Sequence, residues 1–201
     1  ACRRLGVEAL TLYSFSTENW SRPGDEVDGL MALLVRFLVE ERDEILEHRI
    51  RLMASGELDQ LPSHVRGALE QLAAASSHHD GMVLNLALSY GGRQELVRAV
   101  RAVAARVVAG ELDADAIAEA DIERHLDTAG LPDPDLVIRT SGELRLSNFL
   151  LWQIAYSELH VTDVLWPDFR ETDLMRAFDD YGKRQRRFGR TGTQLADGAT
   201  P

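Results

Sequence analysis

Two arginines stand six residues apart in the polar segment RTSGELRLSN, residues 139–148, which directly follows the apolar run DLVI. Arginine suits phosphate because its planar guanidinium donates two hydrogen bonds side by side and stays charged. Gly142 would let the backbone approach a ligand and offer N–H donors. Two interpretations stay open from this spacing. Arg139 and Arg145 bind a polyanion with the help of the hydroxyls of Thr140, Ser141 and Ser147, or they pair with surface carboxylates.

Glu158 follows the apolar segment FLLWQIAY, which places its carboxylate near the interior. An unpaired carboxylate is costly there, so we expect a partner for it. An arginine is the expected partner if Glu158 is considered alone. A phosphate-binding pocket nearby would favour Mg²⁺ instead, because Mg²⁺ commonly bridges one or two carboxylates to substrate phosphates.

Two more polar segments begin where apolar runs end. The first is at 16–22 and carries Ser16, Glu18, Asn19, Trp20 and Arg22. The second is Gly91-Gly92-Arg93, which an ordinary strand-to-helix turn explains equally well. Ligands of parallel α/β sheets bind beyond the carboxyl ends of the strands, so these segments are candidate site residues.

Other kinds of site are not supported by the sequence. No GxxxxGK[ST] loop is present, and no serine lies in a nucleophile-elbow context. The six histidines and the single Cys2 have no zinc-ligand spacing. Trp152 and Trp166 are interpreted as core residues. A basic stretch is either a solvated helix end or a phosphate contact, and it comprises Lys183, Arg184, Arg186, Arg187 and Arg190.

The elements that must position these residues alternate along the chain. Apolar runs predict strands at 7–15, 49–55, 82–90, 135–139 and 159–161, and helical periodicity predicts helices at 26–48, 62–77, between Gly92 and Gly110, at 113–119, 121–128 and 172–187. In the strand at 82–90 the apolar side is formed by Met82, Leu84, Leu86 and Leu88. The alternation predicts an α/β fold with a mainly parallel central sheet flanked by helices. We expect one domain over 1–190 and a disordered tail at 191–201.

Composition limits the partners. The chain has 201 residues and a formal net charge of −11, which argues against a general nucleic-acid or anionic-membrane coat and means that an anionic ligand needs a local cationic cluster. No apolar run reaches the ~20 residues that span a bilayer. A lone cysteine fits a reducing compartment.

Four blocks of the sequence together resemble the cis-prenyltransferases, the undecaprenyl (polyprenyl) diphosphate synthase family. They are YSFSTENWSRP at 13–23, SYGGRQE at 89–95, DLVIRTSGELRLSNFLLWQIAYSELHVTDVLWPDF at 135–169 and RRFG at 186–189. The resemblance implies condensation of isopentenyl diphosphate with an allylic diphosphate such as farnesyl diphosphate. The product is a Z-polyprenyl diphosphate, a precursor of the lipid carrier of cell-wall synthesis.

The resemblance also implies roles for single residues. Arg139, Arg145 and Ser147 match the positions that hold isopentenyl diphosphate, and Glu158 matches a carboxylate that places Mg²⁺. Asn19 and Arg22 match positions near the allylic diphosphate. The mobile loop that closes over the substrates is matched by Ser16, Glu18 and Trp20, with Ser16, Glu18 and Asn19 in supporting catalytic roles and Trp20 and Arg22 in substrate binding. Arg93 matches a family residue without an assigned role.

The chain departs from the family pattern in two places. The Asp-Gly-Asn-Gly-Arg-Trp segment with the catalytic Asp is absent, and Leu144 stands where the family has a histidine. Because the sequence opens on ACRRLG, like the end of a helix closed by Gly6, we expect a domain whose first strand and helix are missing and a chain with little or no activity.

Partners and location follow from the resemblance as expectations. They are a homodimer in the cytoplasm, no nucleic acid, and peripheral contact with the inner face of the membrane through the lipid product. Two alternatives stand beside the enzyme: a non-catalytic partner subunit of a heteromeric cis-prenyltransferase, and an unrelated diphosphate-binding α/β module. The retained Arg139, Arg145, Ser147 and Glu158 argue against the first, and the length of the match at 135–169 argues against the second.

Overall fold

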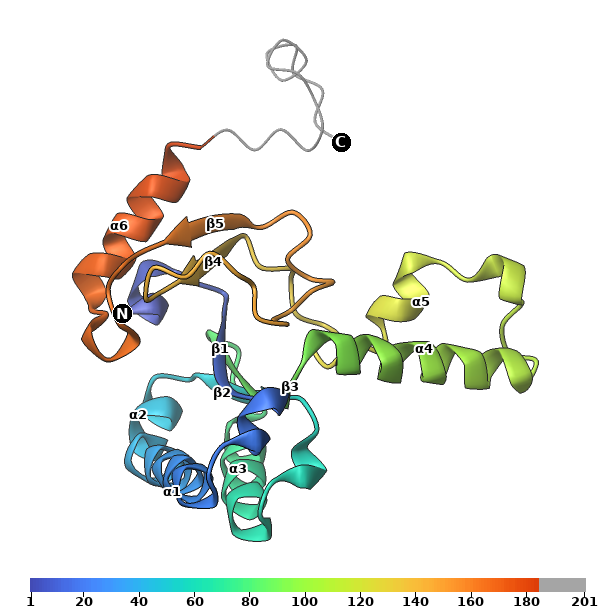
Figure 1. The fold of residues 1–201 in the computed structure, drawn as a ribbon, viewed down its shortest axis with the longest axis horizontal. Helices are drawn as coiled ribbons and strands as arrows, with labels where there is room; N and C mark the ends of the chain where they lie inside the picture. The colour runs from blue at the N-terminus through green and yellow to red at the C-terminus, as the bar shows by residue number, and fades with distance from the viewer. Residues whose placement is uncertain (185–201) are drawn as a thin grey trace. The chain divides into compact units, whose positions relative to one another are not determined.

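The computed structural model describes residues 1–184. They divide into two compact units. Figure 1 shows the helices and strands along the chain. Unit 1 consists of residues 1–132 and 147–152, and unit 2 consists of 133–146 and the residues from 153 onward. The expected single domain over 1–190 stays a prediction, and the expected tail at 191–201 lies outside the described residues.

Unit 1 is built on a parallel sheet of β1 (Ala9–Ser16), β2 (Arg51–Ser55) and β3 (Val83–Tyr90) in the order β1-β3-β2. The predicted strands at 7–15, 49–55 and 82–90 are confirmed. The prediction of one apolar side for the third strand is wrong, because every residue of β3 is buried. A central strand with a partner on each side and covered faces has no solvent side. Its one amide, Asn85, accepts a hydrogen bond from Ser55 Oγ at 3.1 Å.

Three helices cover one face of this sheet: α1 (Gly24–Glu40), α2 (Arg42–Glu47) and α3 (Ser63–Ser76). The predicted single helix at 26–48 is divided into α1 and α2 at Glu41, where the backbone reaches φ −89°, ψ 0°. Leu38 before the break and Ile45 after it are both buried in the core. The division therefore leaves the apolar face continuous.

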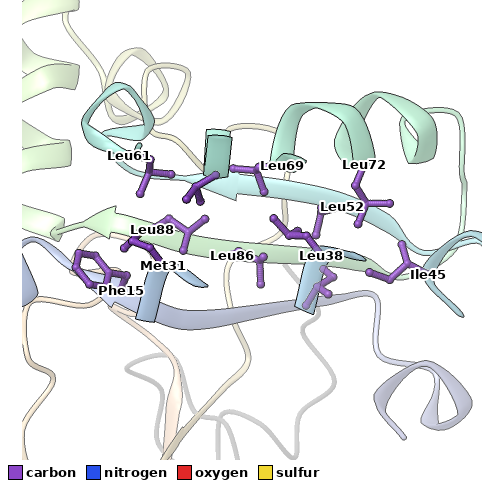
Figure 2. Packing of buried hydrophobic residues seen from close by; sticks show 12 residues of the cluster. Phe15, Met31, Leu38, Ile45, Leu52, Leu61, Leu69, Leu72, Leu86 and Leu88 are labelled. Atoms are coloured by element: carbon purple, nitrogen blue, oxygen red, sulfur yellow. The ribbon is translucent and has the colours of Figure 1, made fainter. Parts of the chain in front are cut away.

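The core lies between these helices and the sheet, as Figure 2 shows. Leu86 and Leu88 of β3 meet Met31 and Leu38 of α1 and Leu69 of α3, all 1–3% exposed. Burying a leucine side chain contributes about 1.5–3 kcal/mol, so this cluster is the main source of the stability of unit 1.

The rest of unit 1 is α4 (Gly92–Val108) and α5 (Glu119–Glu123). The helix predicted between Gly92 and Gly110 is confirmed. The helices predicted at 113–119 and 121–128 are shorter than expected: the first is a 3-10 turn at Ala114–Ala116, and the second shifts to α5. Ile117 and Ala118 between them have extended backbone, which ends the first and begins the second. Further 3-10 turns lie at Cys2–Leu5, Thr17–Ser21 and Leu58–Gln60, and Gly6 ends the first with φ 78°.

Unit 2 holds a two-stranded parallel sheet of β4 (Leu136–Arg139) and β5 (Glu158–Val161), followed by a 3-10 turn at Trp166–Asp168 and by α6 (Glu171–Gly182). Both predicted strands are confirmed within one residue. The helix predicted at 172–187 begins one residue earlier and ends at Gly182. The core interpretation of Trp166 is wrong, because this side chain is 59% exposed.

Candidate active site

The carboxyl ends of β1 and β3 lie side by side in unit 1. Ser16, the last residue of β1, is the register partner of Tyr90, the last residue of β3. The polar segments that follow the two strands therefore begin at one edge of the sheet, as expected from the sequence. The Ser16 N–H donates to Asn19 Oδ1 at 2.9 Å, which folds the next residues into the 3-10 turn Thr17–Ser21.

Trp20 fixes this 3-10 turn to the neighbouring strand. Its indole N–H donates to Ser89 Oγ at 2.8 Å, and its ring meets Phe15 edge to face with centroids 4.8 Å apart. Phe15 belongs to the core cluster. An indole that is both hydrogen-bonded and packed edge to face holds one orientation, so Trp20 ties the turn to the rim of the core.

Arg22 lies just before α1 and pairs with Glu26 at 2.7 Å. Both side chains are nearly half exposed. An exposed pair of this kind is worth only about 0–1 kcal/mol, so it is readily exchanged for a better anion.

Glu18 is held by Asn148, the last residue of the polar segment 139–148. Its Oε1 accepts a hydrogen bond from Asn148 Nδ2 at 3.1 Å. Burial acts to raise the pKa of Glu18, but hydrogen bonds from its own backbone N–H and from the Ser16 and Asn148 side chains outweigh burial and lower the pKa. Glu18 is therefore a carboxylate at neutral pH.

Ser147 lies beside this contact in the same unit. Its backbone is left-handed, with φ 52°, and its carbonyl accepts a hydrogen bond from the Tyr13 hydroxyl at 3.2 Å. The Tyr13 ring stacks on Phe149 with centroids 4.6 Å apart. The backbone of Ser147 is thus anchored to β1 through Tyr13. From the sequence Tyr13 is only one residue of the predicted strand at 7–15, and nothing there indicates this hydrogen bond.

In unit 2, Arg139 and Arg145 meet on a single carboxylate. The Glu143 side chain accepts a hydrogen bond from each guanidinium, one on each oxygen. The Arg139 hydrogen bond is the main reason that the pKa of Glu143 lies below its usual range, with the Arg145 charge adding to it against the effect of burial. Arg139 is about 30% exposed and Arg145 about 67% exposed, and Arg139 Nε is buried without a hydrogen-bond partner among the described residues.

The turn that joins the two arginines is fixed by backbone hydrogen bonds. The N–H groups of Ser141 and Gly142 donate to the carbonyls of Val164 and Thr162 at 3.0 and 2.9 Å. Gly142 has φ 65°, and a Cβ there would lie 2.7 Å from Asp163 Oδ1, so the position favours glycine. The expectation that the Gly142 N–H is offered to a ligand is wrong, because the turn itself uses it.

Glu158 opens β5 and is 29% exposed. Its Oε2 pairs with Arg184 Nη1 at 2.9 Å, which confirms the expected arginine partner. Arg184 also donates to Asp180 Oδ2 at 3.1 Å, and Asp180 accepts from His160 Nδ1 at the same distance. The pKa of Asp180 is lowered first by His160 and then by Arg184.

The structure groups the expected site residues in three places. Ser16, Glu18, Asn19, Trp20 and Arg22 lie in or beside one 3-10 turn of unit 1, to which Asn148 connects the segment after Ser147. Arg139 and Arg145 meet in unit 2. Glu158 pairs with Leu136 at the opposite end of β4 from Arg139, so it does not join the two arginines. Among residues 1–184, no cluster of three or more His, Cys, Asp or Glu side chains is arranged to hold a metal ion.

Comparison with known proteins decides the family. The model of the family described as "Putative undecaprenyl diphosphate synthase" matches residues 1–189. This chain belongs to that family. The isoprenyl transferase of Streptococcus thermophilus is 52% identical over 190 residues, which cover 92% of this chain and 76% of the relative. The isoprenyl transferase of Geobacter sulfurreducens is 47% identical, with 96% and 79% covered.

A solved cis-prenyltransferase relative shares the fold. The crystal structure of lavandulyl diphosphate synthase from Lavandula x intermedia, in complex with dimethylallyl diphosphate, aligns with a TM-score of 0.91 and 40% identity over 93% of this chain and 81% of that one. The α/β class with a parallel sheet flanked by helices is therefore confirmed. The relatives favour a prenyl-transferring enzyme over a non-catalytic partner subunit. None of the helices in the part of the chain that the structure describes is both long and apolar enough to cross a membrane.

Proposed function

We propose that this chain condenses isopentenyl diphosphate with an allylic diphosphate and elongates a Z-polyprenyl diphosphate, the lipid-carrier precursor for cell-wall synthesis. Arg139, Arg145 and Ser147 bind isopentenyl diphosphate. The observation that carries this assignment is the convergence of two guanidiniums on the Glu143 carboxylate. The Glu143 carboxylate takes the place proposed for the diphosphate, because its two oxygens accept one hydrogen bond from each arginine. A diphosphate offers more oxygens and more charge, so it competes well for both.

The allylic diphosphate is assigned to the 3-10 turn of unit 1. Arg22 provides the cation, held only by the exposed pair with Glu26, and Trp20 provides a fixed aromatic wall. Ser16, Glu18 and Asn19 keep the turn in shape and support catalysis. The C–O bond of the allylic diphosphate breaks as a new C–C bond forms to isopentenyl diphosphate, which then loses a proton. Negative charge grows on the leaving diphosphate, and a guanidinium stabilises it.

Mg²⁺ is proposed as the cofactor, with Glu158 as the protein ligand. A partly buried carboxylate fits an ion that usually takes one or two protein carboxylates and completes its shell with phosphate oxygens and water. The Glu158 carboxylate is a suitable ligand for Mg²⁺, but Arg184 competes with the ion because it already pairs with one oxygen of Glu158. When bound, Mg²⁺ would neutralise diphosphate charge. We further propose that the protein is a homodimer in the cytoplasm. It would contact the inner face of the membrane through its lipid product.

The function is tested by Mg²⁺-dependent incorporation of labelled isopentenyl diphosphate into polyprenyl products. In a protein that also carries the Asp-Gly-Asn-Gly-Arg-Trp segment absent from this sequence, Arg139→Ala should raise KM for isopentenyl diphosphate by about tenfold or more, since a charge-assisted hydrogen bond contributes about 1.5–3 kcal/mol. Arg176→Ala is the matched control, an exposed arginine of the same unit that pairs with Asp173 on α6. Unchanged KM and kcat in Arg139→Ala would remove Arg139 from the site.

A further inference from the structure

Asn148 uses every hydrogen-bonding group of its side chain. Its Nδ2 donates to Glu18 Oε1 and to Gln94 Oε1, both at 3.1 Å. Its Oδ1 accepts from the Arg93 N–H at 2.9 Å, and its backbone carbonyl accepts from the Gly92 N–H at 2.7 Å. All of these contacts lie inside unit 1. Asn148 therefore caps the first turn of α4 and at the same time holds the turn that carries Glu18.

The backbone around Asn148 is shaped for this contact. Ser147, Asn148 and Leu150 have φ values of 52°, 62° and 43°, in the left-handed region that is strained for a residue other than glycine. Asparagine tolerates this region better than most residues do. On the other side of the contact, a Cβ at Gly91 would lie 2.7 Å from Asn148 Nδ2 and 2.8 Å from Thr17 Oγ1. Both observations indicate a closely packed contact rather than a chance surface contact. We call the contact between Asn148 and Glu18 the Asn148 joint.

The 3-10 turn Thr17–Ser21, called the Glu18 turn below, is attached to the rest of unit 1 by two side chains with different partners. Trp20 binds it to β3 through Ser89, and Asn148 binds it to the start of α4 through Glu18. The Trp20 attachment fixes the apolar side of the turn. The Asn148 attachment fixes the carboxylate, and its amide also contributes to the lowered pKa of Glu18.

We propose that Asn148 is a positioning residue for prenyl transfer: its Nδ2 sets the place of the Glu18 carboxylate and keeps the 3-10 turn Thr17–Ser21 closed. The inference rests on the proposed function for its catalytic meaning. The joint itself is a physical contact that can be measured without substrate. Because Asn148 directly follows Ser147, the contact lies next to the one residue of unit 1 that is assigned to isopentenyl diphosphate.

The substitution Asn148→Asp separates the two tasks of Asn148. The new carboxylate still accepts from the Arg93 N–H, and a negative charge at the start of α4 is favourable. The oxygen that replaces Nδ2 faces Glu18 and repels it. Amide hydrogen exchange of the peptide at 16–22 reports the turn, whose Arg22 N–H donates to the Asn19 carbonyl. We expect this peptide to exchange about tenfold faster or more, with an unchanged melting temperature.

A reciprocal substitution and a matched control complete the test. In Asn148→Asp combined with Glu18→Gln, the amide introduced at position 18 can donate to the carboxylate introduced at position 148, so protection of 16–22 should return to within about twofold of the original. Gln94→Ala removes the other acceptor of Nδ2 and should leave the exchange unchanged. If Asn148→Asp does not fold, Glu18→Ala breaks the same contact with the α4 cap intact and should accelerate exchange equally. The proposal that Asn148 holds the turn is overturned if exchange is unchanged in Asn148→Asp, or in Glu18→Ala where that variant is used instead. It is also overturned if Asn148→Asp combined with Glu18→Gln does not restore protection.

Kinetics then connect the joint to catalysis. Asn148→Asp should raise KM for the allylic diphosphate or lower kcat, and the same change should have almost no further effect when Glu18 is already replaced by alanine. Effects that multiply would show that Asn148 does not act through Glu18. No prenyl transfer by an unsubstituted protein that also carries the Asp-Gly-Asn-Gly-Arg-Trp segment overturns the proposed function, whereas the exchange data decide independently whether Asn148 holds the turn.

Discussion

Glu143 is the residue whose charge most directly opposes the proposed substrate. It neutralises Arg139 and Arg145 together, so a diphosphate must displace it before binding. Glu143→Gln should therefore strengthen binding of inorganic pyrophosphate by about two- to tenfold, since each partly exposed ion pair is worth about 0–1 kcal/mol. Isothermal titration calorimetry measures this effect, with Asp179→Asn on α6 as a control for loss of charge. Weaker binding would mean that Glu143 orients the arginines more than it blocks them.

Glu158 allows a second test at the residue scale. Glu158→Gln should increase several-fold the Mg²⁺ concentration needed for half-maximal activity, because a neutral amide oxygen is a poorer ligand for a hard cation. Asp180→Asn is the control, since Asp180 shares Arg184 with Glu158 but is not the proposed ligand. An equal Mg²⁺ requirement in both variants would assign Glu158 to the ion pair alone.

The sequence named the candidate site residues and the chemical class of some partners, an arginine for Glu158 and, as one of two interpretations, carboxylates for Arg139 and Arg145. Arg139, Arg145 and Glu158 could be found because charged residues beside apolar strands require an explanation. That one carboxylate, Glu143, takes both arginines and that Asn148 contacts Glu18 could not be predicted, because each depends on side-chain directions that only the folded turn sets. Asn148 pairs with Glu18 across 130 residues, and nothing in its local sequence indicates that distance.

At the scale of elements, β3 and α4 are joined by a chain of polar contacts that starts from the buried Tyr90 and Glu95. Tyr90 donates to Glu95 Oε2 at 2.6 Å, the Asp127 N–H donates to Glu95 Oε1 at 2.9 Å, and Arg98 pairs with Asp127 at 2.6 Å. Burial first and the Glu95 hydrogen bond second raise the pKa of Tyr90, so it remains a neutral donor. Polar groups buried at 0% exposure, such as Tyr90 and Glu95, are stable only with partners.

Tyr90→Phe should lower the free energy of unfolding by about 1–3 kcal/mol, the cost of removing a hydrogen bond from a buried carboxylate. Urea denaturation measures the change. A loss below about 0.5 kcal/mol would indicate that water or a rearranged neighbour replaces the hydroxyl.

The packing of β3 against α1 and α3 gives a second prediction at this scale. Leu86→Ala should cost about 2–5 kcal/mol, because Leu86 is 2% exposed in the middle of the cluster and the cavity cannot close (Figure 2). Leu33→Ala on the exposed side of α1 should change stability by no more than about 0.5 kcal/mol. Similar losses in both would contradict the assignment of the core.

Elements were predicted from sequence where burial is continuous and missed where it is not. The run at 82–90 is mostly apolar, with only Asn85 and Ser89 as strongly polar residues, so its strand was found. The break at Glu41 was missed because Leu38 and Ile45 keep the helical spacing across it. The short helices after Gly110 were placed inaccurately because their residues are mostly exposed, and an exposed segment has little hydrophobic pattern to read.

At the scale of the whole molecule, the carboxylates set the dependence of stability on pH. Hydrogen bonds and arginine charges lower the pKa values of Glu18, Asp80, Asp121, Glu143 and Asp180. A lowered pKa contributes stability that is present above the pKa of the unfolded chain, about 4, and lost as the pH falls through the folded value. Asp127 has the opposite sign, because burial raises its pKa and its contribution declines as the pH rises through that value.

The urea midpoint should therefore fall when the pH is lowered from about 5 to about 3, since the carboxylates with lowered pKa outnumber the one with a raised pKa. Between about pH 6 and 8 the five carboxylates with lowered pKa values contribute no change. Denaturation curves at fixed ionic strength measure both ranges. A midpoint that rises in acid would mean that Asp127 outweighs the others.

The contact between Glu18 and Asn148 also has a consequence for folding during synthesis on the ribosome. Its partners are 130 residues apart, and the Tyr13–Ser147 hydrogen bond spans 134. A ribosome makes about 5–20 residues per second, so the Glu18 turn emerges several seconds before the asparagine that closes it. Until then β1, β2 and β3 have time to assemble. The nascent chain thus completes its core first and acquires the closed Glu18 turn only late in its synthesis.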